Sequence, residues 1–119
     1  MIRLGVLGST KGTDLQAILD AIQNDKLVAD VVVVISNREN AHILKRARNH
    51  NVPDIFVSDR GKTRDEFDRE ITAALHQHEA ELVLLIGFMR ILSAEFCQEW
   101  QDQILNVHPS LLPKYSGAM

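Results

Sequence analysis

The sequence predicts an α/β protein with a doubly wound, Rossmann-like parallel sheet and helices on both faces of that sheet. The first observation is a set of apolar runs, of which residues 28–35 are nearly all β-branched, as in strands covered on both sides. The second is that apolar residues between these runs recur every three or four positions, which is typical of helices. Strands separated by such helices require right-handed crossovers and a parallel sheet, whose ligands bind at the carboxyl ends of its strands.

Each element is placed along the chain from its pattern and its boundary residues. The first strand, residues 2–8, runs into a loop of glycine and hydroxyl residues, and Thr13 or Asp14 is expected to cap the next helix with a side-chain oxygen. Ser93 is expected to cap a later short helix in the same way, with Cys97 as a small core residue of that helix. The remaining predicted elements are a helix at 40–49, a strand at 54–57, a helix at 63–78, a strand at 81–87 and a strand at 104–107.

Composition restricts the classes of function. The 119 residues suit one compact domain, and 13 Lys and Arg against 16 Asp and Glu leave a formal net charge of −3. This charge gives no general attraction to nucleic acid or to anionic membranes, so neither is an expected partner. No apolar stretch approaches the roughly 18 residues of a membrane span. The single cysteine fits a reducing compartment, and the sequence therefore indicates a cytoplasmic location.

The loop after the first strand is a candidate phosphate site. Residues 8–13 are glycines, hydroxyl residues and one lysine, and they open a helix, so backbone amides and the helix dipole can hold a phosphate there. The spacing of Gly8 and Gly12 matches neither the dinucleotide fingerprint nor the Walker-type loop. A simple tight turn is the alternative interpretation.

The last predicted strand ends in an amide and an imidazole. Asn106 and His108 are two residues apart, so strand alternation points them to one side, and Pro109 restrains His108 toward an extended backbone. The amide can stabilise charge on a carbonyl oxygen and the imidazole can move a proton, which suggests acyl-type transfer. The alternative is that both side chains only satisfy buried backbone groups near a turn.

No metal site is expected from the other histidines. His76 and His78 are two residues apart on a predicted helix, and residues at that spacing face different directions. The sequence therefore predicts chemistry without a bound metal.

Several segments together resemble one enzyme family. They are Leu15-Gln16-Ala17-Ile18, Ser36-Asn37, residues 87–93 (Gly-Phe-Met-Arg-Ile-Leu-Ser) and residues 106–115 (Asn-Val-His-Pro-Ser-Leu-Leu-Pro-Lys-Tyr). In this order they are similar to the signatures of phosphoribosylglycinamide formyltransferases, and the resemblance runs through the whole chain. The last two segments are closer to that family than to methionyl-tRNA formyltransferase or formyltetrahydrofolate hydrolase.

The resemblance implies a reaction and a set of site residues. The reaction is formyl transfer from 10-formyltetrahydrofolate, a cosubstrate, to the amine of glycinamide ribonucleotide in de novo purine synthesis. Asn106 and His108 would be catalytic: the amine attacks the formyl carbon, the amide steadies the oxyanion and the imidazole transfers protons. The residue matches assign Gly12, Thr13 and Asp14 to the nucleotide phosphate, and Arg64, Met89, Arg90, Ile91, Leu92 and Asn106 to the folate.

Three features depart from the family pattern. Asp14 stands where the family usually has asparagine, and a carboxylate beside a phosphate is repelled unless it points away as a helix cap. Residues 116–119, Ser-Gly-Ala-Met, replace the usual Pro-Gly continuation. The family also continues well beyond this length with a catalytic aspartate, so residues 1–119 are interpreted as the N-terminal nucleotide-binding part of a truncated formyltransferase domain. Impaired activity and self-association of exposed sheet surface, in the simplest case as a homodimer, are expected from this.

Two other functions stay open at this point. A non-catalytic phosphate- or nucleotide-binding module would use the same glycine-containing loop. A 10-formyltetrahydrofolate hydrolase would direct water rather than an amine at the same carbonyl carbon.

Overall fold

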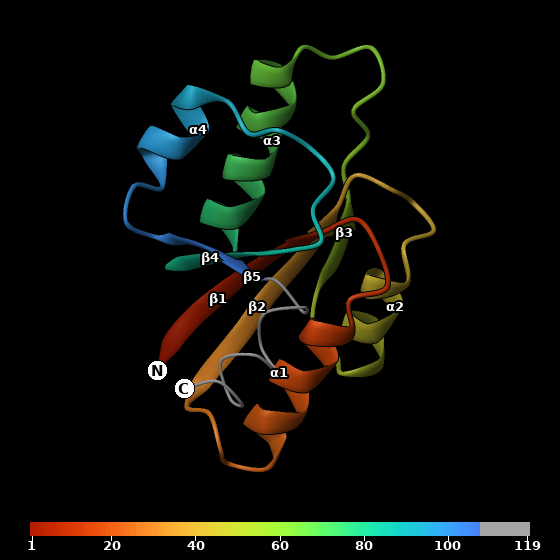
Figure 1. The fold of residues 1–119 in the computed structure, drawn as a ribbon, viewed down its shortest axis with the longest axis vertical. Coiled ribbons are helices and arrows are strands. Elements are labelled where there is room, and N and C mark those ends of the chain that lie inside the picture. The colour runs from red at the N-terminus through yellow and green to blue at the C-terminus, as the bar shows by residue number, and fades with distance from the viewer. Residues whose placement is uncertain (108–119) are drawn as a thin grey trace, which may run out of the picture.

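The protein forms a five-stranded parallel sheet flanked by four helices in the part of the chain that the computed structural model describes, residues 1–107 (Figure 1). Strands and helices alternate without exception over this range, as the apolar patterns predict. The elements are β1 (Ile2–Gly8), α1 (Thr13–Gln23), β2 (Ala29–Ser36), α2 (His42–Asn49), β3 (Asp54–Phe56), α3 (Arg64–Gln77), β4 (Leu82–Ile86), α4 (Ala94–Glu99) and β5 (Ile104–Val107).

The strand order is β3-β2-β1-β4-β5, and every neighbouring pair is parallel. The chain builds outward from β1 to β3 and then returns to the other side of β1 with β4. This reversal between β1 and β4 is the topological switch point, where the loops after the two strands diverge and leave a place for ligands. The predicted doubly wound architecture is confirmed.

The helices cover the two faces of the sheet in pairs. In Figure 1, α1 and α2 lie on one side of the strands and α3 and α4 on the other. Each pair closes its own hydrophobic cluster: Leu15 and Ile43 pack in the first, and Phe67 and Phe96 pack in the second. Because both faces are buried, the β-branched run in β2 has no need of polar alternation.

Helix α1 begins differently from the prediction. Its N-cap is Gly12, in the left-handed conformation with φ of 70°, and no side chain caps the helix. Thr13 and Asp14 are already inside the first turn, so the prediction that one of them caps α1 was wrong. Helices α3 and α4 do have side-chain caps: Thr63 forms a reciprocal capping box with Glu66, and Ser93 accepts a bond from the Phe96 amide as predicted.

Two smaller differences have local causes. Helix α2 begins at His42 rather than at residue 40, because the chain first makes a turn in which the Ala41 amide donates to the Arg38 carbonyl. Cys97 is exposed rather than part of the core. Helix α4 is only six residues long, and its contact with the sheet is made by Phe96 and by the following Trp100, which leaves Cys97 on the outer side.

Candidate active site

The loop after β1, residues 9–12 and here called the β1 loop, is held by close contact with α2. A Cβ on Gly12 would lie 2.7 Å from the Ile43 Cβ, and the Ile43 amide donates to the Thr10 carbonyl at 3.1 Å. Arg46 Nε donates to the Lys11 carbonyl at 2.6 Å. The backbone of the loop is therefore clamped to α2 at three points, and only glycine fits at position 12.

The three residues predicted for the phosphate have different environments. Gly12 is buried, Thr13 is exposed, and Asp14 is 9% exposed. Among residues 1–107, Asp14 Oδ2 has no hydrogen-bond partner. The carboxylate lies in the first turn of α1, where the positive end of the helix dipole favours negative charge.

A depression of about 430 Å³ adjoins the β1 loop on the α2 side. Its lining carries more positive than negative groups, because Lys11 and Arg38 face a single carboxylate, Glu39. This balance suits an anionic ligand group. The complete lining is Ser9, Thr10, Lys11, Arg38, Glu39, Asn40, Ala41 and His42.

The segment after β4, residues 87–92 and here called the β4 segment, exposes apolar side chains. Met89 is 61% and Ile91 is 73% exposed, although neighbouring Leu92 packs against the core cluster under α3 and α4. Arg90 behaves in the opposite way: its Nη1 donates to Asp59 Oδ2 at 3.0 Å, and its guanidinium carbon lies 4.6 Å from the centre of the Phe67 ring. The segment thus exposes the apolar side chains of Met89 and Ile91, whereas the charged side chain of Arg90 packs inward.

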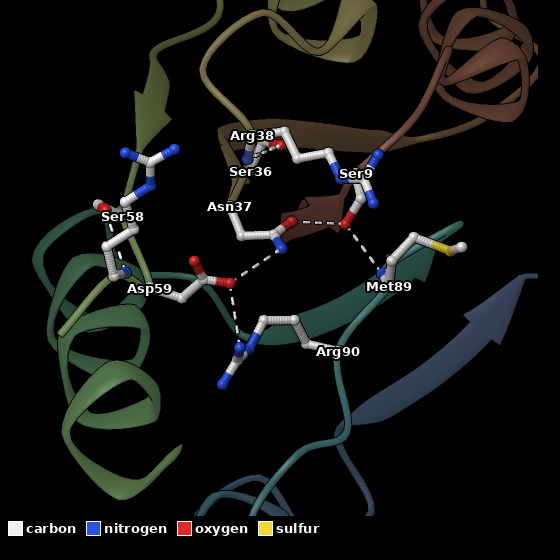
Figure 2. Close-up of polar contacts among 9 residues, drawn as sticks. Ser9, Ser36, Asn37, Arg38, Ser58, Asp59, Met89 and Arg90 are labelled. Atoms are coloured by element: carbon white, nitrogen blue, oxygen red, sulfur yellow. Dashed lines mark hydrogen bonds and ion pairs between the residues drawn. The ribbon is translucent and has the colours of Figure 1, made fainter. Parts of the chain in front are cut away.

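A chain of polar contacts joins the two segments across the ends of the strands (Figure 2). Ser9 Oγ donates to Asn37 Oδ1 at 2.6 Å and accepts from the Met89 amide at 2.8 Å. Asn37 Nδ2 in turn donates to Asp59 Oδ2 at 3.5 Å, the same oxygen that receives Arg90. These contacts bring together residues that follow β1, β2, β3 and β4.

Sequence reasoning missed the roles of Ser9 and Asp59. Ser9 is only 3% exposed, and its signal was its position directly after the first strand, which was interpreted as part of a phosphate loop. Asp59 follows β3 in an irregular stretch and has no motif around it. Only the packing of four strand ends reveals its two partners.

The remaining predicted site residues lie at the edges of the described region. Asn106 is exposed on β5, the edge strand, where it is the register partner of Leu85 in β4. Arg64 is the exposed first residue of α3 and makes no hydrogen bond or ion pair with the β4 segment within residues 1–107. His108 and the departure at residues 116–119 lie outside the described residues.

The fold defines the class of protein first: this is a doubly wound α/β domain whose candidate ligand-binding segments lie at the carboxyl ends of parallel strands. The chain belongs to the formyl transferase family, which it matches over residues 2–119. This agrees with the resemblance seen in the sequence motifs.

Individual relatives show the same similarity. The trifunctional purine biosynthetic protein adenosine-3 of Drosophila melanogaster is 42% identical over 118 residues, which are 97% of this chain and 9% of that protein. Phosphoribosylglycinamide formyltransferase of Haemophilus influenzae is 39% identical over 118 residues, covering 98% of this chain and 56% of the relative. The crystal structure of glycinamide ribonucleotide transformylase 1 from Symbiobacterium toebii superposes with a TM-score of 0.88 at 40% identity, covering 95% of this chain and 54% of that one. The chain thus spans about half the length of these bacterial relatives.

Residues 1–107 contain neither a helix suited to a membrane nor a cluster suited to a metal ion. None of the helices within residues 1–107 combines the length and the apolar character needed to cross a membrane. No group of three or more His, Cys, Asp or Glu side chains in this range is arranged to hold a metal ion.

Proposed function

We propose that the protein to which this chain belongs transfers the formyl group of 10-formyltetrahydrofolate to the amine of glycinamide ribonucleotide. The observation that carries the proposal is the arrangement at the strand ends: an amide on β5 lies beside β4, whose following segment exposes two apolar side chains and is bonded to the β1 loop. An anionic nucleotide and a large, flat, partly apolar cosubstrate need these two kinds of surface next to each other. Membership of the formyl transferase family supports the same reaction.

The two substrates would divide the site between them. The phosphate of the nucleotide would bind the backbone amides of Gly12, Thr13 and Asp14 at the start of α1. The folate would contact Arg64 and the β4 segment through the Met89 and Ile91 side chains and through backbone groups of Arg90 and Leu92. This division agrees with the burial of the Arg90 guanidinium against Asp59 and Phe67.

Chemistry would take place between the two subsites. The uncharged amine attacks the formyl carbon and forms a tetrahedral adduct, whose oxyanion receives a hydrogen bond from the Asn106 amide. His108 removes the proton from the attacking nitrogen and delivers a proton to the departing nitrogen of the folate. Folate is thus a cosubstrate in this proposal, and the mechanism needs no metal.

We further propose that residues 1–119 form the nucleotide-binding part of the formyltransferase domain and that the enzyme works in the cytoplasm, where the single cysteine stays reduced.

The decisive experiment is the rate of tetrahydrofolate formation from 10-formyltetrahydrofolate, with and without glycinamide ribonucleotide. It uses the product of the complete reading frame that contains this sequence and, in parallel, the 119-residue chain. Turnover that depends on the nucleotide supports the proposal. Turnover at the same rate with and without the nucleotide would identify a hydrolase. Nucleotide binding without any turnover would identify a binding module.

Asn106→Ala tests the catalytic assignment. Loss of an oxyanion donor should lower kcat by about 10²- to 10³-fold, with much smaller changes in both KM values. Leu105→Ala is the matched control, because Leu105 is an exposed neighbour on the same strand and carries no polar group. Equal kinetics in the two variants would contradict a role for the amide in the reaction.

A further inference from the structure

Arg90 has an unusual environment for a residue in a ligand-binding segment. Its side chain is 24% exposed, its Nη1 is paired with Asp59 and its guanidinium plane lies over Phe67. Its Nε is buried and has no hydrogen-bond partner among residues 1–107. A buried donor without a partner is costly, so the ion pair and the ring contact must offset that cost. The arginine therefore serves to draw the β4 segment inward.

The β4 segment has a second attachment on the opposite side of Arg90. The Met89 amide donates to Ser9 Oγ at 2.8 Å, and the Gly87 carbonyl accepts from the Ser9 amide at 3.2 Å. Ser9 itself is almost completely buried and is oriented by Asn37. Figure 2 shows Ser9 and Asp59 approaching the segment from different strands, with Asn37 between them.

The two attachments determine where the exposed apolar side chains point. Met89 and Ile91 flank Arg90 at a bend in the chain, and both residues are largely exposed whereas the Arg90 side chain is only 24% exposed. Anchoring the Arg90 side chain inward at Asp59 therefore presents Met89 and Ile91 outward. Anchoring the Met89 amide at Ser9 sets the distance of that surface from the β1 loop.

We propose that Ser9 and Asp59 are positioning residues for the formyl donor. Without touching the donor, they hold the β4 segment so that its folate-binding surface keeps a fixed position relative to the β1 loop. This inference rests on the proposed function for its ligands. It assigns different consequences to the two residues. Asp59 acts mainly on the folate surface, because it bonds to Arg90 at 3.0 Å and reaches Asn37 only at 3.5 Å, whereas Ser9 lies in the β1 loop and couples the folate and nucleotide subsites.

Amide hydrogen exchange in the absence of any ligand tests the positioning directly. In the product of the complete reading frame, Ser9→Ala and Asp59→Ala should each raise exchange in a peptide covering residues 87–92 by roughly three- to tenfold, the effect of losing one or two hydrogen bonds. Asp54→Ala is the matched control. Asp54 lies at the amino end of β3, in an ion pair with Arg48 at 2.6 Å, and not at the carboxyl ends of the strands where the candidate site lies. Exchange in this peptide equal to that of the control would overturn the proposal.

Steady-state kinetics then separate positioning from a general effect on folding. Asp59→Ala should raise KM for 10-formyltetrahydrofolate by about tenfold with little change in KM for the nucleotide, and Ser9→Ala should raise both. Asp59→Asn keeps an oxygen acceptor for Arg90 and should restore part of the folate affinity. A lowered melting temperature with unchanged KM values in both variants would mean that the contacts only stabilise the fold.

The hydrogen-exchange measurement does not depend on the proposed reaction. If the wild-type protein fails to transfer formyl groups to the nucleotide, the proposed function falls, whereas the exchange measurement still decides whether Ser9 and Asp59 hold the β4 segment. If the reaction proceeds and the exchange of residues 87–92 is insensitive to both variants, the positioning inference falls alone.

Discussion

The β1 loop and the β4 segment lie side by side at the strand ends, yet their backbones are held in different ways. The β1 loop is held to α2 by hydrogen bonds to its backbone carbonyls, from the Ile43 amide and from Arg46, and by the absence of a side chain at Gly12, which lets Ile43 come close. The β4 segment is held by polar side chains, Ser9 on one side and Asp59 on the other. We expect the first arrangement to suit an anion at the loop amides and the second to suit a ring system on exposed apolar side chains.

This difference implies different tolerance to change. A backbone clamped by α2 cannot move to accept a new Cβ without moving the helix. A segment held by side-chain hydrogen bonds can lose one bond and remain folded, with a change of position rather than of fold. Stability should therefore respond to substitutions at Gly12, where the β1 loop contacts α2, and ligand affinity to substitutions in the β4 segment.

The largest effect is expected for Gly12→Ala. The substitution places a Cβ in a backbone with φ of 70° and 2.7 Å from the Ile43 Cβ, so the free energy of unfolding should fall by about 3 kcal/mol in urea titrations. Gly61→Ala is the matched control, because Gly61 has the same φ of 70° and nothing within 4 Å of its added Cβ. It should cost only about 1 kcal/mol, and an equal loss in both variants would contradict the clamp by α2.

The double substitution Met89→Ser and Ile91→Ser should have the opposite profile. Both side chains are largely exposed, so the free energy of unfolding should change by less than about 0.5 kcal/mol per site. If the folate covers them, its KM should rise by about tenfold, equivalent to about 1.4 kcal/mol of lost apolar contact. Val28→Ser, at a residue 76% exposed before β2, provides the control. An unchanged KM would show that the apolar surface is not the folate subsite.

Gly87→Ala tests whether the β4 segment accommodates an added Cβ at a small cost in stability. Gly87 has a φ of 60°, and its added Cβ would lie 2.7 Å from Thr10 Oγ1, the end of an exposed side chain that can rotate away. The expected loss is about 1 kcal/mol, close to the value for Gly61→Ala and well below that for Gly12→Ala. Adding Thr10→Ala should recover little. A loss as large as that of Gly12→Ala would remove the contrast between the two segments.

The smallest effect is expected at the beginning of α3. This helix is capped by the side chains of Thr63 and Glu66, whereas the N-cap of α1 is a glycine. Hydrogen bonding from the Thr63 amide, followed by that from the Thr63 side chain, holds the pKa of Glu66 below its usual value. A carboxyl whose pKa is lower in the folded state stabilises the fold above its unfolded pKa, and this stabilisation disappears as the pH falls through the folded pKa. Glu66→Gln should therefore lower the melting temperature slightly at pH 7, and this difference should shrink as the pH falls toward 3. A difference that persists at pH 3 would show that the charge is not the cause.

Three of the four family motifs in the sequence were informative because they coincide with strand ends, whereas residues 15–18 lie within α1. Ser36-Asn37, residues 87–93 and Asn106 all fall directly after or near the end of a strand, so the parallel topology brings them to one edge of the sheet. The cap of α1 could not be predicted in the same way. Thr13 and Asp14 are good capping residues, but the contact of Ile43 with Gly12 shifts the cap one residue earlier.

What the sequence by itself determined is the order of strands and helices, the parallel sheet and the family, because apolar periodicity and contiguous motifs are local properties of the chain. What only the tertiary structure decided is which polar side chains meet at the strand ends. Ser9 and Met89 are 80 residues apart, and Asp59 and Arg90 are 31 apart. Such contacts depend on strand register and on how the helices pack against the sheet, and the pattern of a single segment contains neither.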